Sequence, residues 1–248
     1  MTKIKTIKEF NVDNKPLIVG LPGMGRVGYV SVNYLLSRVG GELVAEVYST
    51  AFPPQLLVGK GGLSTLFVGR IYDAGKFLIF TGDAQPQSPE GQNELCDALL
   101  NYLTSKGTLN SVIATAAYVV PEFNEERKVF ITGNQADFIE ELKSFGGEVL
   151  NEGVITGVNG VIVGWAGYYG IKGAVALGET WSAIVEFDET DYRAVKAVIS
   201  LLNKYLSMNV DPEPLTSLAT VVEHRINATI AQMTKVARRE TKESREVM

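Results

Sequence analysis

The sequence predicts an α/β fold: a three-layer α/β/α sandwich around a largely parallel mixed sheet, followed by a C-terminal helical extension. Two observations carry this prediction. Short apolar segments of the buried-strand type alternate with amphipathic segments of helical period along most of the 248 residues, which is typical of a sheet covered by helices on both faces. A rigid break, Asp211-Pro212-Glu213-Pro214, then precedes a last amphipathic segment.

The break divides the chain into two units. We assign residues 1–210 to the α/β/α domain and residues 211–248 to a C-terminal amphipathic helix with a charged tail.

The first third of the chain should contain a strand, a helix and an antiparallel region. LIVGL at residues 17–21 has the pattern of a buried strand, a helix follows over about 26–39, and ELVAEVYS at 42–49 is the next strand. Near residues 56–82 we expect antiparallel pairing, because LSTLFVGRIYD and KFLIFTGDA are joined through DAGK, a composition that suits a hairpin turn.

The remainder of the domain continues the alternation. A helix should begin at Ser88, which is followed by a proline and an acid in the first turn, and another should follow Asn134 and stop at Gly146. A third helix is predicted from the apolar period Val195 to Leu206. Between these helices lie the strand-like segments SVIATAAYV, KVFIT and GAVAL, which start at residues 111, 128 and 173.

One segment departs from this pattern. GVITGVNGVIVGWAGYYGIKG, at residues 153–173, carries glycines three and four residues apart, so several should share one face of a helix. Glycine costs about 1 kcal/mol relative to alanine inside a helix, so such a stripe implies a compensating close contact. Two interpretations stay open here: tight packing of the helix on the sheet, or a contact with another subunit or with a ligand.

Composition excludes several classes of partner. A net charge of −5 gives no basis for binding nucleic acid, which requires a concentrated basic surface. Cys96 is the only cysteine, so no intrachain disulfide and no thiolate metal cluster can form. The first residues are too polar for a signal peptide, and no apolar run approaches about 20 residues. We expect a soluble cytoplasmic protein without a membrane partner.

The turn after the first strand carries the pattern G-x-G-x-x-G at Gly23, Gly25 and Gly28. A dinucleotide site also needs an acid at the end of the second strand, about 20 residues on, and no acid lies clearly at that position. A lone phosphate could instead be held by the turn amides and Arg26, because a cation in the first helical turn opposes the helix dipole unless an anion is bound there. Gly23, Gly25, Arg26 and Gly28 therefore form an alternative phosphate site.

The sequence contains few residue patterns typical of catalytic sites. His224 is the only histidine, and its place on the C-terminal helix favours a surface role. Asp73, Asp83 and Glu179 lie near strand ends, where α/β active sites form, yet each also suits a turn or a cap and none has an evident partner for general acid–base work. Cys96 lies near the apolar face of its helix and suits a small core residue. The sequence predicts no catalytic, cofactor-binding or metal-binding residue, no cofactor and no enzyme activity.

The C-terminal segment predicts a surface for other proteins. Its apolar residues recur at intervals of three and four, which describes an amphipathic helix that either folds back on its own domain or packs against another subunit. The predicted partner-binding residues are Leu218, Val222, Ile226, Ile230, Met233, Val247 and Met248.

Several motifs together resemble one known family. LIVGLPGMGRVG, FPP at Phe52, RIYDAGKFLIFTGDAQP at Arg70, the glycine-rich helix and LGET at Leu177 occur in the order seen in the archaeal proteasome-assembly-chaperone family, over roughly residues 15–207. The resemblance implies a fold like that of nucleoside phosphorylases without their catalysis, homo-oligomeric assembly, and ATP-independent binding to proteasome α-subunits or α-rings. Under it, Gly25 and Gly28 let the helix approach the sheet.

The chain departs from that family at its C-terminus. Several proteasome-binding members end in a hydrophobic residue, a tyrosine and one final residue, whereas this chain ends in Glu246, Val247 and Met248. A glutamate in an apolar pocket is costly without a partner, so docking of the tail on the α-ring stays open, as does engagement of a partner chaperone.

The prediction is a non-enzymatic chaperone or adaptor for proteasome assembly. The alternatives are a nucleoside-phosphorylase-like enzyme that binds phosphate at the Gly23–Gly28 turn and a purely self-assembling scaffold.

Overall fold

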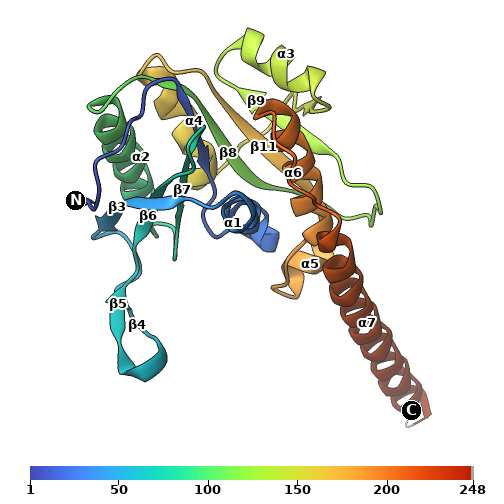
Figure 1. Cartoon of the computed structure of the whole chain (residues 1–248). Helices are drawn as coiled ribbons and strands as arrows, with labels where there is room; N and C mark the ends of the chain where they lie inside the picture. The colour runs from blue at the N-terminus through green and yellow to red at the C-terminus, as the bar shows by residue number, and fades with distance from the viewer. Residues whose placement is uncertain (247–248) are drawn as a thin grey trace.

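Nine strands form one mixed sheet in the order β1-β3-β6-β7-β2-β8-β11-β9-β10. The computed structural model, drawn in Figure 1, describes the backbone of residues 1–246 and the side chains of residues 1–235. The strands of the sheet are β1 (Thr2–Thr6), β2 (Lys15–Val19), β3 (Glu42–Ser49), β6 (Gly69–Asp73), β7 (Leu78–Gly82), β8 (Leu109–Val120), β9 (Val129–Gly133), β10 (Glu148–Val149) and β11 (Gly173–Trp181).

The middle of the sheet is parallel, as predicted. β2 pairs in parallel with β7 on one side and with β8 on the other, placing Leu17 opposite Leu78 and Val112, and β8 continues in parallel to β11. The antiparallel excursion is confirmed as well, because β6 and β7 form a hairpin through DAGK and β3 pairs antiparallel with β6. The central strands are buried, and their apolar side chains face helices on both sides.

Helices cover the two faces of the sheet in separate groups. Buried side chains of α2 and α4 pack on one face, and those of α1, α3 and α6 pack on the other, which confirms the three-layer sandwich. The helices are α1 (Val27–Val39), which follows the short 3-10 turn η1 (Met24–Arg26), α2 (Pro89–Thr104), α3 (Ala136–Ser144), α4 (Val158–Tyr168), α5 (Ser182–Glu186), α6 (Tyr192–Tyr205) and α7 (Pro214–Glu246).

Several elements were not predicted. β1 and β10 lie at the two edges of the sheet, and α5 is a short helix after β11. The segment LSTLFVGRIYD does not form one strand: Ser64–Leu66 is β5, which pairs with β4 (Leu56–Val58) in a separate two-stranded hairpin, and only Gly69–Asp73 enters the main sheet. The change of sheet falls between Leu66 and Gly69, where no periodic signal marks it.

The glycine-rich segment needs a correction. Only residues 158–168 are helical, whereas Gly153, Gly157 and Gly170 lie outside α4 with positive φ. Within the helix, a Cβ on Gly164 would meet no described atom within 4 Å. Gly164 therefore does not mediate tight packing. The other two glycines of the helix do lie in close contact: a Cβ on Gly160 would be 2.3 Å from Ile155, and one on Gly167 would be 3.1 Å from Asn134.

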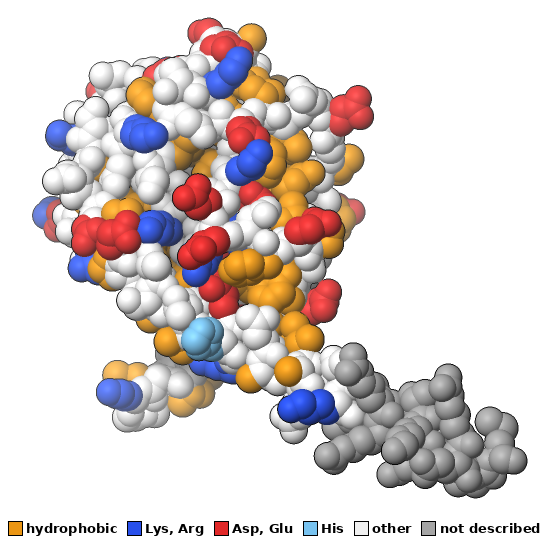
Figure 2. Space-filling view, turned by 90° about the vertical axis from the view of Figure 1, so that its right-hand side faces the viewer, with side chains coloured by type: hydrophobic (Ala, Val, Ile, Leu, Met, Phe, Trp, Pro, Cys, Tyr) orange, Lys and Arg blue, Asp and Glu red, His pale blue; other side chains and the backbone are white. Residues whose placement is uncertain are grey.

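Two elements project from the same end of the domain. The β4–β5 hairpin extends from one side and α7 from the other, and the two lie apart in Figure 1 and again in the view turned by 90° in Figure 2. Within the described residues, no helix combines the length and the hydropathy needed to cross a membrane.

Candidate functional site

The first turns of α7 pack against the chain's own domain. Leu215 joins the core beneath α6, while Val222 and Ile226 form a small cluster with Ala183 and Ile184 of α5. Val222 and Ile226 are only 5% and 2% exposed. This half of the helix therefore belongs to the fold of its own protomer.

Ion pairs anchor the same half of α7. The Arg193 guanidinium of α6 donates to both carboxylate oxygens of Glu223, at 2.5 Å from Nε and 3.0 Å from Nη2. Both side chains are mostly buried, and the hydrogen bonds to Glu223 raise the pKa of Arg193. Arg225 pairs with Glu189 at 2.5 Å on a more exposed flank. A buried bidentate pair gives geometric specificity, so it sets the direction in which α7 leaves the domain.

Beyond Ile226 the apolar stripe of α7 continues and becomes increasingly exposed. A helix turns by about 100° per residue, so Ile230 and Met233 lie on the stripe that carries Val222 and Ile226. They are 37% and 60% exposed. Residues 226–234 contain no charged side chain. An exposed apolar stripe with no charge is typical of a protein-interaction surface.

A second exposed apolar area lies on the flank of the anchored half. Leu218 and Val221 are 46% and 58% exposed and lie to one side of the buried stripe. Leu218 was among the predicted partner-binding residues, but Val221 was not, because it falls outside the heptad-like spacing.

The structure separates the predicted partner-binding residues into groups. Leu218, Ile230 and Met233 present apolar surface, whereas Val222 and Ile226 are covered by the chain's own α5, which corrects the expectation for these two. Val247 and Met248 lie outside the described residues.

The glycine turn after β2 is a close structural corner. A Cβ on Gly28 would lie 2.2 Å from the carbonyl oxygen of Thr115 in β8, so only glycine allows α1 to approach the sheet this closely. Gly25 has φ +54° and faces Thr180. The expectation that these two glycines let the helix approach the sheet is confirmed.

Arg26 pairs with a carboxylate of its own chain. Its Nη2 donates to the carbonyl and the carboxylate oxygens of Asp188, at 3.0 Å and 3.1 Å. The cation of the hypothetical phosphate site therefore has a carboxylate partner within the chain, which accounts for a cation at the N-cap of α1 without a bound anion.

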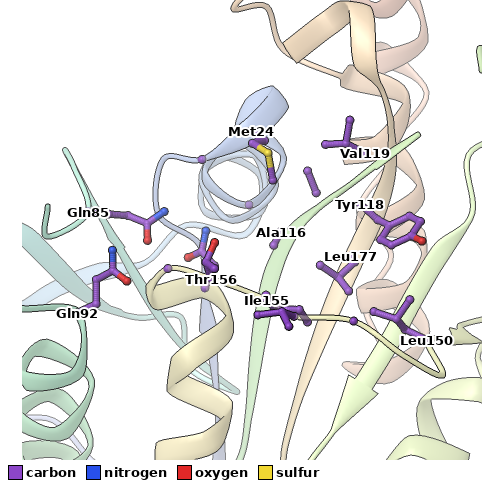
Figure 3. Close-up of a pocket in the computed structure, with 17 residues that line it drawn as sticks. Met24, Gln85, Gln92, Ala116, Tyr118, Val119, Leu150, Ile155, Thr156 and Leu177 are labelled. Atoms are coloured by element: carbon purple, nitrogen blue, oxygen red, sulfur yellow. The ribbon is translucent and has the colours of Figure 1, made fainter. Parts of the chain in front are cut away.

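A cavity of about 540 Å³ lies where β2, β8 and β11 end, beside the glycine turn. Figure 3 shows Gln85 and Gln92 on one side of it and Tyr118 and Leu150 on the other. Among the described residues that line it, none carries a charge, and Arg26 is not one of them. The residues around the cavity are Gly23, Met24, Gly28, Gln85, Gln92, Ala116, Ala117, Tyr118, Val119, Leu150, Gly153, Val154, Ile155, Thr156, Gly157, Asn159 and Leu177.

Two side-chain amides of this cavity hold its walls together. The Asn159 amide accepts from the backbone N–H of Leu21 and donates to the Leu21 carbonyl, both at 2.9 Å. Gln85 donates to the Pro22 carbonyl at 2.6 Å and accepts from the Val158 N–H at 2.8 Å. These amides tie the glycine turn to the start of α4, and their bonds to backbone groups explain their presence.

The strand-end carboxylates also have structural partners. Asp73 binds Lys15 at 2.8 Å, Asp83 binds Arg70 at 2.7 Å, and the buried Glu179 accepts from the backbone N–H of Lys128 at 3.0 Å. Cys96 is fully buried, and this burial raises its pKa to about 12. The described residues contain no group of three or more histidine, cysteine or acidic side chains placed to hold a metal ion.

A family model and a known archaeal protein match most of this chain. The model of the PAC2 family matches residues 17–230. An uncharacterized protein of Methanocaldococcus jannaschii is 28% identical over 230 residues, which are 90% of this chain and 85% of that protein.

Solved structures with the same fold come from the archaeon Pyrococcus furiosus. PbaA, an archaeal homolog of proteasome-assembly chaperone, is 31% identical with a TM-score of 0.77, over 99% of this chain and 98% of PbaA. PbaB, an archaeal proteasome activator, is 26% identical with a TM-score of 0.83, over 92% of this chain and 98% of PbaB.

Proposed function

This chain belongs to the PAC2 family, and from that premise we propose that it is a proteasome-assembly chaperone or adaptor. It forms a homo-oligomer and binds proteasome α-subunits, the α-ring or a partner chaperone. It works without ATP and without catalysing a reaction. The similarity to PbaA over nearly the whole of both chains supports the assembly role.

The observation that carries this proposal is the apolar surface of α7. The helix is anchored to its own domain only as far as Ile226, and beyond that residue it extends an uncharged stripe away from the domain. Apolar surface that is held away from its own core is suited to contacts with other chains. Leu218 and Val221 add a second apolar area next to the anchor.

The chemistry of the domain supports a binding role over catalysis. Each acidic residue that ends a strand near a potential active site is paired within the fold, and the cavity beside the glycine turn is apolar with engaged amides. General acid–base catalysis needs a side chain placed to exchange a proton with a bound substrate. Among the described residues that line the cavity, Tyr118 is the only one of a type that serves this role, and no histidine or carboxylate stands beside it in that lining.

A pull-down with proteasome α-subunits tests the proposal. Truncation after Val210 would expose Ile184, which α7 buries, and could therefore destabilise the domain itself. A point substitution on α7 separates loss of binding from loss of folding. We expect the wild-type protein to retain α-subunits and Leu218→Glu to retain at least tenfold less, because a charge replaces apolar contact area. Thr220→Glu is the matched control, because Thr220 is also exposed in the anchored half of α7 but lies on the opposite side of the helix from Leu218.

The outcomes separate the alternatives. Retention by wild type and by Thr220→Glu, with loss in Leu218→Glu, supports the chaperone proposal. If wild-type protein and α-subunits elute separately at micromolar concentrations, with no ATP and no other factor present, binding to α-subunits is refuted. A native mass equal to the 26.9 kDa chain would refute the homo-oligomer.

A further inference from the structure

The β4–β5 hairpin presents apolar side chains with almost no support from its own chain. Leu56 pairs with Leu66 across the two strands, and Val58 is on the same face, two residues further along β4. These three side chains are between 56% and 71% exposed, and Leu63 at the turn is 80% exposed. We call the surface of Leu56, Val58 and Leu66 the hairpin face.

The apolar side chains of this hairpin need a surface that buries them. An isolated two-stranded hairpin is marginally stable in water, and every residue from 58 to 66 is exposed. Residues 51–69 carry a single charge, Lys60, in a chain that is 21% charged. Depletion of charge is what distinguishes the core of a protein interface from ordinary surface.

The free segment of α7 offers a matching surface. Ile230 and Met233 are exposed on a segment without charge, so contact between this stripe and the hairpin face would bury no unpaired ion. Both surfaces project from the same end of one protomer, but they lie apart in both views of the molecule. Within one protomer, therefore, the hairpin face and the α7 stripe do not bury each other.

We propose that the hairpin face of one copy packs against Ile230 and Met233 of α7 in a neighbouring copy. The proposal rests on the homo-oligomer proposed above and names its contact. If the hairpin is stable only when another surface buries its apolar side chains, that surface has to be present whenever the chain is present. A second copy of the chain meets this condition at any expression level. Each copy gives one surface and receives the other, and such a heterologous contact closes into a ring when its rotation allows.

This assignment divides α7 between two tasks. The end of the stripe holds the neighbouring copy, while the flank of Leu218 and Val221 stays available to the proteasomal partner. In a closed ring, rotational symmetry gives every copy of α7 the same inclination to the ring axis.

Cysteine crosslinking tests the contact directly. Cys96 is buried with its pKa raised to about 12, so introduced cysteines are the reactive thiols. We expect the double variant Val58→Cys, Met233→Cys to give, with a short bis-maleimide, a ladder of covalent multimers in steps of 26.9 kDa. Each single variant should stay at the mass of one chain.

Other patterns would overturn the proposal. Dimers from Val58→Cys alone would mean that two hairpins pair with each other, and dimers from Met233→Cys alone would mean that α7 pairs with α7. No ladder from the double variant, although the native mass shows an oligomer, would place the subunit contact elsewhere.

A charge variant separates this inference from the proposed function. Leu56→Glu should lower the native mass to that of one chain, and Thr65→Glu, on the opposite face of the same hairpin, should keep the wild-type mass. If Leu56→Glu keeps the oligomer but loses α-subunits, the hairpin binds the proteasomal partner and this inference fails while the proposed function stands. A wild-type protein that is a single chain at micromolar concentration would overturn both the ring and the proposed oligomer.

Discussion

Substituting alanine for Gly28 tests whether the glycine turn is a packing corner. The new Cβ would lie 2.2 Å from the Thr115 carbonyl oxygen, and real Cβ contacts are essentially never shorter than 3.0 Å. The obstacle is backbone at both ends, so α1 has to withdraw from β8. The withdrawal also weakens the hydrogen bond from Thr115 Oγ1 to the Gly28 carbonyl, which is 3.2 Å long.

The expected cost combines three effects. Overpacking of a core costs about 1–3 kcal/mol. The weakened hydrogen bond adds less than about 1 kcal/mol, because the Thr115 hydroxyl also donates to the Val19 carbonyl at 2.9 Å. Alanine returns up to about 1 kcal/mol through its better helix propensity. We therefore expect Gly28→Ala to lower the free energy of unfolding by about 2 kcal/mol.

Gly164→Ala is the matched control, because Gly164 is also helical but a Cβ there would meet no described atom within 4 Å. It should raise the free energy of unfolding by up to about 1 kcal/mol. Both variants are measured by urea unfolding, followed by circular dichroism, at one protein concentration, because association changes apparent stability. Equal stability of Gly28→Ala and wild type, or shifts of the same sign in both variants, would refute the packing argument.

Three further predictions follow from burial. The Cys96 thiol, whose pKa is raised to about 12 by burial, should resist thiol reagents at pH 8 and react once the chain is unfolded in urea; fast labelling of the folded protein would contradict its place in the core. Asp191→Ala should lower the free energy of unfolding by about 3–5 kcal/mol, because it leaves the buried Arg127 without its carboxylate and removes the cap of α6. A cost below about 1 kcal/mol is the value of an exposed ion pair and would show that the pair is solvated. Ile226→Ala should cost about 2–5 kcal/mol and Ile230→Ala far less in urea unfolding of the dissociated chain, whereas equal costs would mean that α7 packs on its own domain beyond Ile226.

The candidate site was predictable in part. The spacing of apolar residues correctly predicted the C-terminal helix and its stripe, because helical period depends on local sequence alone. It could not distinguish Ile226, which the domain buries, from Ile230, which stays 37% exposed. Both residues satisfy the same period, and the difference is only where the body of the domain ends. The β4–β5 hairpin was missed as a surface because its short apolar strands look like ordinary core strands.

By itself the sequence determined the local features of this protein. The cap at Ser88, which accepts from the Gly91 N–H at 3.0 Å, the buried strand β2 and the alternation of strands and helices follow from capping groups and hydrophobic period, which act over a few residues. Only the tertiary structure decided which apolar faces find a partner within the chain. A pattern encodes that a face must be buried, but what buries it depends on how far the packed layers reach, and here they stop short of the hairpin face and of the end of the α7 stripe.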